Sequence, residues 1–353
     1  MRVIRSLIVL SIIAIIVFYF LEPEESDFNT TAKQEVNVKT NVLQSKIAPE
    51  TKTQKTSLEG DMYSWIGKSE QELVEAMGEP VRKDLSAYNY QWWVYTDNLE
   101  RYIQIGIEDE KIKTIYAVGD DLKLDPVEVG QSYDYLNKEF TFEEEVEYTE
   151  GISSYTFRMT AEDMKRRPLV KIADDVFLQL YFDTFTNQLS SIRVMEADIL
   201  LRHRPYEIVY RGSLPDEPDL SETEWSQVES GMEKQVFDIS NVLRNRFEKN
   251  ELAWEDEVSE VAFTHSRDMH DNNYFSHYSL NGDGLKERLA VTGLFYIAAG
   301  ENIAAQYPDA PSAVEGWLNS EGHREALLTD EYTHLGVGVY RFYYTQNFLA
   351  KPM

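Results

Sequence analysis

The chain of 353 residues contains no cysteine. This absence rules out disulfide bonds, a cysteine nucleophile and lipid attachment through a cysteine side chain. It also argues against the class of small secreted domains that depend on disulfide bonds, because a chain of this length can bury a sufficient hydrophobic core without them.

Several catalytic signatures are missing as well. The sequence has no Gly-x-Ser-x-Gly, no His-Glu-x-x-His, no phosphate-binding P-loop and no convincing dinucleotide-binding fingerprint. It therefore gives no support to a serine hydrolase, a zinc protease of the His-Glu type or a nucleotide-dependent enzyme.

Basic residues are scarce. The chain has 34 Lys and Arg against 62 Asp and Glu, and its net charge is -28. Such an acidic protein is poorly suited to nucleic acid or to an anionic membrane surface, so we expect no nucleic-acid partner. We interpret the acidic excess as a solubilising surface, and a surface that attracts cations is the alternative.

Charged residues are also absent from a run near the N-terminus, Ser6 to Leu21, which follows Arg2 and Arg5. The run of about 16 residues is slightly short for a membrane-spanning helix and long for the apolar region of a signal peptide. No small-x-small cleavage site follows it. We therefore predict an uncleaved signal-anchor, a transmembrane segment at residues 1–21 with its basic flank inside. The bulk of the chain would be extracytoplasmic on a single-pass membrane protein, or secreted if the segment is cleaved.

The rest of the chain divides into linkers and folded domains. Residues 22–60 are polar and without periodicity, which predicts a flexible linker. Residues 209–231 contain two prolines and many acids, which predicts a second linker. Folded domains are expected at 61–208 and 232–353. Because the second linker has few apolar residues to support an interface, we expect these domains to unfold separately.

The domain at 61–208 has a weak internal duplication. Ile66-Gly67-Lys68-Ser69 opens one copy and Val129-Gly130-Gln131-Ser132 opens the other. Each opening precedes runs rich in β-branched and aromatic residues that predict strands. Ser69 with Glu72 fits a capping box at the start of a short helix. The pattern predicts an α+β domain without a catalytic constellation.

The domain at 232–353 combines helices and strands in a different order. Apolar residues recur at helical spacing over 236–247 and 258–269, and two final runs, 335–340 and 343–349, predict strands. Helices at the start and strands at the end predict an α+β domain whose helices cover both faces of a sheet.

Five of the six histidines lie in this last domain, and two have distinctive surroundings. His277 ends Asn-Tyr-Phe-Ser-His, and His323 lies in Asn-Ser-Glu-Gly-His-Arg. Glu301 stands between them in Gly-Glu-Asn-Ile. Two imidazoles and a carboxylate from three segments can form a metal site or a polar ligand site once the fold brings them together. The alternative is that the three side chains only hydrogen-bond one another and hold the loops in place.

Five further positions carry specific expectations. His265 lies on the apolar face of its helix and is expected in the core or lining a cleft, whereas His203, between two arginines, is expected in solvent. Asn302 is expected to satisfy buried backbone groups. Gly336 and Gly338 alternate on a strand, which predicts close approach of another element.

The C-terminal domain resembles the CAP superfamily, which comprises cysteine-rich secretory, antigen 5 and pathogenesis-related proteins, and in particular its exported bacterial (SCP-like) branch. The domain at 61–208 resembles the CAP-associated N-terminal domain of such proteins. The first resemblance rests on the following stretches, in the family's order: Ala262–Met269, Asn273–His277, Gly300–Ala304, Val314–Ser320, Gly322–Arg324, Tyr332–Gly338 and Tyr344–Phe348.

The resemblance implies a three-layer α-β-α sandwich and a cleft that holds two histidines and two acids. The histidines correspond to His277 and His323, and the first acid corresponds to Glu301. The family's second acid falls on Ser320, so Glu321 and Glu315 are the alternatives for this position.

Two functions stay open. The first is a membrane-anchored protein of a bacterial envelope that binds a small ligand in its cleft, with a cell-wall polymer or an envelope protein as a further partner. The second is a metal-assisted hydrolase in which His277, His323 and Glu301 hold Zn²⁺ or another divalent cation. Whether the protein is an enzyme is not decided by its sequence, because one fold supports many functions.

Overall fold

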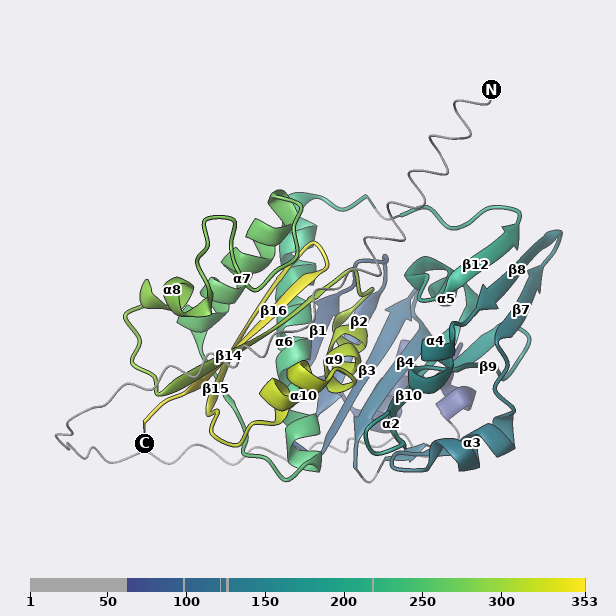
Figure 1. Cartoon of the computed structure of the whole chain (residues 1–353). Coiled ribbons are helices and arrows are strands. Elements are labelled where there is room, and N and C mark those ends of the chain that lie inside the picture. Colours follow the sequence, from purple (N-terminus) through teal and green to yellow (C-terminus); the bar gives the residue numbers. More distant parts are fainter. Residues whose placement is uncertain (1–61, 98, 121, 125–126, 218, 353) are drawn as a thin grey trace, which may run out of the picture. The chain divides into compact units, whose positions relative to one another are not determined.

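The computed structural model describes residues 62–353 except 98, 121, 125–126, 218 and 353 (Figure 1). All described residues belong to one compact unit. The predicted signal-anchor at 1–21 and the linker at 22–60 lie outside the described residues. Within the described part, no helix is both long enough and apolar enough to span a membrane.

The first half is built on a seven-stranded antiparallel sheet in the order β1-β2-β3-β4-β11-β10-β9. A three-stranded sheet, β12-β8-β7, and a small pair, β5-β6, accompany it. The strands are β1 (Arg82–Leu85), β2 (Gln91–Thr96), β3 (Arg101–Glu108), β4 (Lys111–Gly119), β5 (Lys123–Leu124), β6 (Val127–Glu128), β7 (Glu145–Glu150), β8 (Ser153–Arg158), β9 (Leu169–Lys171), β10 (Val176–Asp183), β11 (Gln188–Glu196) and β12 (Glu207–Arg211). The helices are η1 (Met62–Trp65), α2 (Glu70–Met77), α3 (Tyr133–Phe140), α4 (Ala161–Arg166) and α5 (Ala197–His203).

The two halves of the large sheet repeat one arrangement around the neighbouring strands β4 and β11. Gly67 donates its backbone N–H to Ile112 at 2.8 Å, and Gly130 donates to Leu189 at the same distance. Both glycines have a positive φ, 82° and 92°, which a residue with a Cβ adopts only at a cost. Ser69 forms the expected capping box with Glu72 at the start of α2, and Ser132 caps α3.

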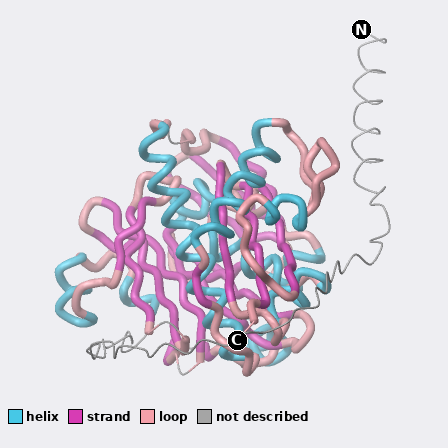
Figure 2. Tube along the Cα trace, turned by 90° about the vertical axis from the view of Figure 1, so that its left-hand side faces the viewer, coloured by secondary structure: helices cyan, strands magenta, loops and turns pink. Residues whose placement is uncertain are grey.

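The second half contains a four-stranded sheet in the order β13-β15-β16-β14, so β14 is an edge strand. Helix α7 packs on one face, while α6, α9 and α10 pack on the other, which makes three layers (Figures 1 and 2). The mixed α+β class is as expected. The elements are α6 (Glu222–Arg246), β13 (Ala253–Trp254), α7 (Asp256–Asp271), α8 (Leu285–Ala290), β14 (Ala298–Ala305), α9 (Ala310–Leu318), α10 (Glu321–Leu328), β15 (His334–Tyr340) and β16 (Tyr343–Ala350).

Two glycines allow α7 to lie directly against β15. A Cβ at Gly336 would collide with the backbone of Val258 and Ser259, and a Cβ at Gly338 would collide with that of Ala262 and Phe263. The close approach expected from the alternating glycines is therefore confirmed.

Helix α6 corrects the expected linker at 209–231. Strand β12 occupies the start of that segment and α6 begins at Glu222, so the irregular connection covers only 212–221. Ser221 and Glu224 form a capping box that starts the helix. This helix start was not predicted because the many acidic residues of the segment were interpreted as part of a linker.

The two halves also share one hydrophobic core, contrary to the expectation that few apolar residues support an interface between them. Helix α6 contacts β1, β3 and β4 of the first half and β15 of the second (Figure 1). The shared cluster includes Tyr102, Tyr116 and Tyr181 from the first half and Val236 and Ile239 from α6. A fragment that begins at residue 232 would cut α6 within its length and expose this interface.

His203 is buried at 5% exposure, so the expectation that it is solvated is wrong. Its Nε2 lies 2.8 Å from the hydroxyl of Tyr90 and its Nδ1 lies 3.2 Å from Arg193. Burial lowers the pKa of His203 to about 3, so the ring is neutral in the folded protein. Its neighbour Arg202 instead reaches Glu108 through two hydrogen bonds.

Candidate functional site

The structure brings His277, Glu301 and His323 together, as expected from the sequence. His277 follows α7 in a loop, Glu301 lies on β14, and His323 lies on the first turn of α10. The Nδ1 atom of His277 is 2.9 Å from Oε1 of Glu301, and the two imidazole ring centres are 6.4 Å apart.

The position of β14 at the sheet edge explains how these segments meet. Successive side chains of a strand point to opposite faces. Glu301 therefore reaches the loop that carries His277, while Asn302 reaches α10 on the other face. There Asn302 donates from Nδ2 to the backbone carbonyl of His323 at 3.0 Å and to Gln346 at 3.2 Å. The expected structural role of Asn302 is thus confirmed.

Glu301 is the buried centre of the site, with a side chain 4% exposed. Arg288 of α8 donates to its Oε2 atom at 2.6 Å. Burial opposes ionisation of Glu301, but the hydrogen bond to His277 and the charge of Arg288 together outweigh it, so the pKa of Glu301 lies below its ordinary value. Arg288 also donates to the backbone carbonyls of His277 and Asp283, which fixes the loop.

His323 is held by a hydroxyl group instead of a carboxylate. Its Nδ1 atom lies 2.8 Å from Oγ of Ser320, the position where the family resemblance places an acid. Burial lowers the pKa of His323 to about 4, and nearby His277 adds to this effect. The ring is therefore neutral at physiological pH.

Neither alternative for the second acid enters the site. Glu315 is 3% exposed and faces the first half of the chain, where it accepts hydrogen bonds from Tyr116, Ser190 and Ser191 at 3.3, 3.1 and 2.5 Å. Glu321 lines an open groove of about 460 Å³ on α10. The side chain of Ser320 occupies the place that either carboxylate was expected to fill beside His323.

The three-residue metal set of His277, His323 and Glu301 does not form. No group of three His, Cys, Asp or Glu side chains in the described residues is arranged to hold a metal ion. The physical reason is that both oxygens of Glu301 are already engaged, one by His277 and one by the Arg288 guanidinium, whose positive charge would oppose a cation. Glu301 orients an imidazole here.

The second ring nitrogens of the two imidazoles, Nε2 in each, determine what this group of residues can bind. When the Nδ1–H of His277 is donated to Glu301 and the other ring nitrogen carries no proton, Nε2 is a hydrogen-bond acceptor. Neutral His323 bonds to Ser320 through Nδ1, and when the hydroxyl donates, the Nε2–H of His323 is a donor. The pair thus offers both an acceptor and a donor to one molecule.

Exposed apolar side chains lie close to His277 along the chain. Phe275 and Tyr278 are 55% and 49% exposed, and Leu280 is 70% exposed. Val291, Phe295 and Ile297, on the connection from α8 to β14, are also exposed. A polar centre with apolar surroundings is typical of small-molecule sites.

The remaining histidines lie outside this arrangement. His265 is 1% exposed and its Nε2 lies 3.0 Å from the carbonyl of Ser276, so its expected place in the core is confirmed. His270 pairs with Asp271 on the surface of α7. His334 lies on β15 with its Nδ1 atom 2.8 Å from the hydroxyl of Thr333.

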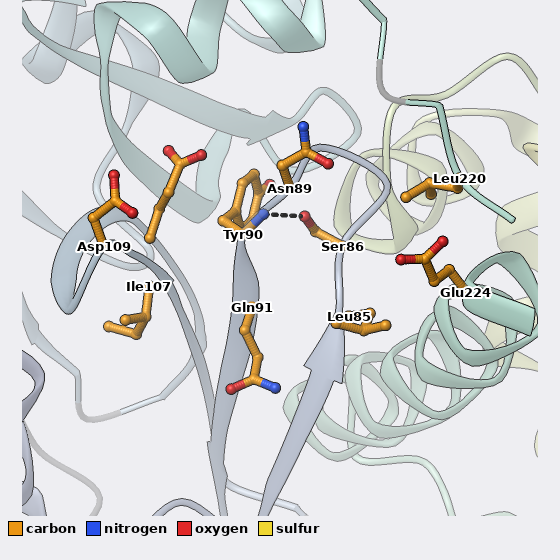
Figure 3. Close-up of a pocket in the computed structure, with 10 residues that line it drawn as sticks. Leu85, Ser86, Asn89, Tyr90, Gln91, Ile107, Asp109, Leu220 and Glu224 are labelled. Atoms are coloured by element: carbon orange, nitrogen blue, oxygen red, sulfur yellow. Dashed lines mark hydrogen bonds between the residues drawn. The ribbon is translucent and has the colours of Figure 1, made fainter.

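A cavity between the first half and the start of α6 has a different composition. It has a volume of about 460 Å³ and lies between the turn of Ser86 to Tyr90, the turn at Ile107 to Asp109 and the start of α6. Figure 3 shows the residues that line it. Ser86 accepts a hydrogen bond from the backbone of Tyr90 there, and the nearby Glu108 is bound by Arg202. None of the expected site residues lines it.

Arg288 and Ser320 are the site residues that sequence reasoning missed. Arg288 lies on a short helix, and the direction of its side chain relative to β14 depends on the tertiary fold. Its position in the sequence therefore did not predict a contact with Glu301. Ser320 was visible as the departure from the family pattern. Its hydroxyl bond to His323 could have been proposed from their i,i+3 spacing on a helix.

Comparisons with known proteins agree with this arrangement. A family model described as "CAP-associated N-terminal" matches residues 66–206, and one described as "Cysteine-rich secretory protein family" matches residues 237–350. A Bacillus subtilis protein named "Uncharacterized membrane protein YlbC" is 45% identical over 290 residues, which are 82% of this chain and 84% of that protein. The chain belongs to the CAP family.

Solved structures carry the same fold. An extracellular protein containing an SCP domain from Bacillus anthracis has 40% sequence identity and a TM-score of 0.79, and the match covers 86% of this chain and all of that one. A cysteine-rich secretory protein from Staphylococcus aureus has 22% identity and a TM-score of 0.73 over 83% of this chain and 96% of its own, which is a likeness of fold.

Proposed function

We propose that the cleft between His277 and His323 binds a small, uncharged polar ligand at the bacterial cell envelope. The observation that carries this proposal is the fixed orientation of the two imidazoles, one by Glu301 at 2.9 Å and the other by Ser320 at 2.8 Å. In the described residues neither Nε2 atom has a hydrogen-bond partner, so both are available to bond to a ligand.

The kind of ligand follows from the groups in the cleft. An acceptor and a donor at neighbouring rings match a molecule with hydroxyl or amide groups, and Glu301 is neutralised by Arg288, so the site has no surplus charge to attract an ion. The exposed Phe275 and Tyr278 beside His277 offer apolar contact to the rest of the molecule. Sugars with N-acetyl groups combine these features.

The place of action is part of the same proposal. Residues 1–21 would anchor the chain in the membrane, and both folded halves of the chain would lie outside the cell, where a wall polymer or an envelope protein would be the further partner. Support comes from the B. subtilis relative, which is named a membrane protein, and from the B. anthracis structure, which is named extracellular.

Calorimetric titration of the full chain with a panel of N-acetylglucosamine oligomers tests the ligand. We expect binding that His277→Ala and His323→Ala each weaken by about tenfold, the value of one hydrogen bond. His270→Ala, which removes a surface histidine of α7 outside the cleft, is the matched control and should bind as the unaltered chain does.

Two outcomes would contradict the proposal. One is equal affinity in the cleft variants and the His270 control. The other is no binding of the panel accompanied by a single Zn²⁺ site that both cleft variants abolish. The second result would favour the metal-dependent alternative, with the two imidazoles as its protein ligands.

A further inference from the structure

Helices α9 and α10, which lead to His323, are held by the first half of the chain along their length. At the start of α9, Asp309 accepts a hydrogen bond from Arg193 at 2.6 Å, with both side chains 2% exposed. In the middle, Glu315 accepts from Ser191 at 2.5 Å. At the end, Asn319 meets the turn between β10 and β11.

The contacts are densest at the junction of α9 and α10. Asn319 donates to the carbonyl of Phe182 at 2.9 Å and accepts from the backbone and the hydroxyl of Thr184, both at 2.8 Å. Asp183 accepts two hydrogen bonds from Arg324, each 2.9 Å long. The Arg324 guanidinium lies 4.8 Å and 4.7 Å from the rings of Phe185 and Phe247.

The start of α10 depends on these contacts. Its N-cap residue, Ser320, makes no side-chain capping bond, because its hydroxyl bonds to the ring of His323. A helix of only eight residues without a cap has little stability of its own. The Asp183–Arg324 pair and the bonds of Asn319 fix the first turn in place of a cap.

We propose that Asp183 is a positioning residue for the cleft and that, through Arg324, it keeps the His323 ring on Ser320 and facing His277. The importance of this role rests on the proposed ligand site. The first half of the chain thereby controls the geometry of a site that lies in the second half. Any partner that displaces the β10–β11 turn would alter the cleft.

The state of the His323 ring tests the proposal without a ligand. In nitrogen NMR spectra of the full chain with labelled histidine, recorded at neutral pH and assigned with His323→Gln, Asp183→Ala should shift the Nδ1 signal of His323 as its bond to Ser320 is lost. The rate at which diethylpyrocarbonate modifies His323 should rise several-fold, while the rate at the surface residue His270 stays constant.

Asp238→Ala is the matched control. It removes another Arg–Asp pair between the two halves, Arg82 to Asp238 at 3.0 Å, but on α6. Both variants should lower the melting temperature, and only Asp183→Ala should change the His323 signals. If Asp183→Ala does not fold, Asp183→Asn should give a smaller change in the same direction.

An unchanged His323 signal in a folded Asp183 variant would overturn the proposal, and so would equal changes in the Asp238 control. Because no ligand takes part, failure of the N-acetylglucosamine titration leaves this result interpretable. Conversely, a shifted ring signal with normal ligand affinity would show that the ring is positioned by Asp183 and that the proposed binding does not use it.

Discussion

Three buried carboxylates in the second half have the same degree of burial and different charge states. Glu301 is paired with Arg288 and Asp309 with Arg193, and the pKa of each lies below its ordinary value although burial opposes ionisation. Glu315 receives hydroxyl groups only, and burial raises its pKa to about 7. A nearby guanidinium therefore decides which of these acids is ionised.

Glu315 should make the stability of the protein depend on pH. Its pKa in the folded chain, about 7, exceeds the unfolded value of 4.5, so between these values the folded state binds more protons. The free energy of unfolding should thus fall as pH rises from about 4.5 through 7, by up to about 3 kcal/mol in total. Urea titrations of the unaltered chain and Glu315→Gln across this range measure the difference in slope.

The Gln variant should lack this component at every pH. In the described residues, the Oε2 atom of Glu315 has no hydrogen-bond partner. An amide nitrogen in its place would bury hydrogens without an acceptor, so a constant loss of stability is also expected. The slope with pH, and not the absolute value, is the informative quantity. Parallel pH profiles for the two proteins would show that Glu315 is ionised throughout.

At the scale of elements, the sequence predicts those features whose signal is local. The alternating glycines of β15, the capping box of α2 and the two helical patterns of the C-terminal domain each depend on a few neighbouring residues, and each is found. The expectation for His203 failed because its burial depends on α5 packing against Tyr90, 113 residues earlier in the sequence. Arg288 escaped prediction although it is only 13 residues from Glu301, because its direction relative to β14 depends on the tertiary fold.

The contact between α7 and β15 should tolerate no side chain at Gly338. Gly338→Ala places a Cβ against the backbone of Phe263, and since backbone cannot rotate away, the helix must move. We expect a loss of at least about 2 kcal/mol in the free energy of unfolding, measured in urea. Gly322→Ala is the control, because no atom lies within 4 Å of its Cβ and the change should amount to no more than about 1 kcal/mol. Similar losses in both variants would mean that α7 adjusts freely.

At the scale of the whole described unit, α6 and α9 are the elements that unite the two halves. Family models match the halves separately, at 66–206 and 237–350, yet α6 packs on strands of both sheets. The sequence did not predict this packing for two reasons. The start of α6 is rich in acidic residues, and its buried face packs against residues of the first half, such as Tyr102 and Tyr116. The boundary between the two family matches therefore does not separate two hydrophobic cores.

The chain should therefore unfold as one cooperative unit. Hydrogen exchange in increasing urea should remove protection from β3–β4 and from β15–β16 at the same concentration, because each half loses core contacts when the other unfolds. Asp309→Asn sharpens the test. It leaves the buried Arg193 without its charged partner, which should cost about 3 kcal/mol. In a single cooperative unit this cost lowers both transitions equally, although Asp309 belongs to the second half alone. Earlier loss of protection in one half, or a shift confined to β15–β16, would instead show two domains that unfold separately, as the sequence alone suggested.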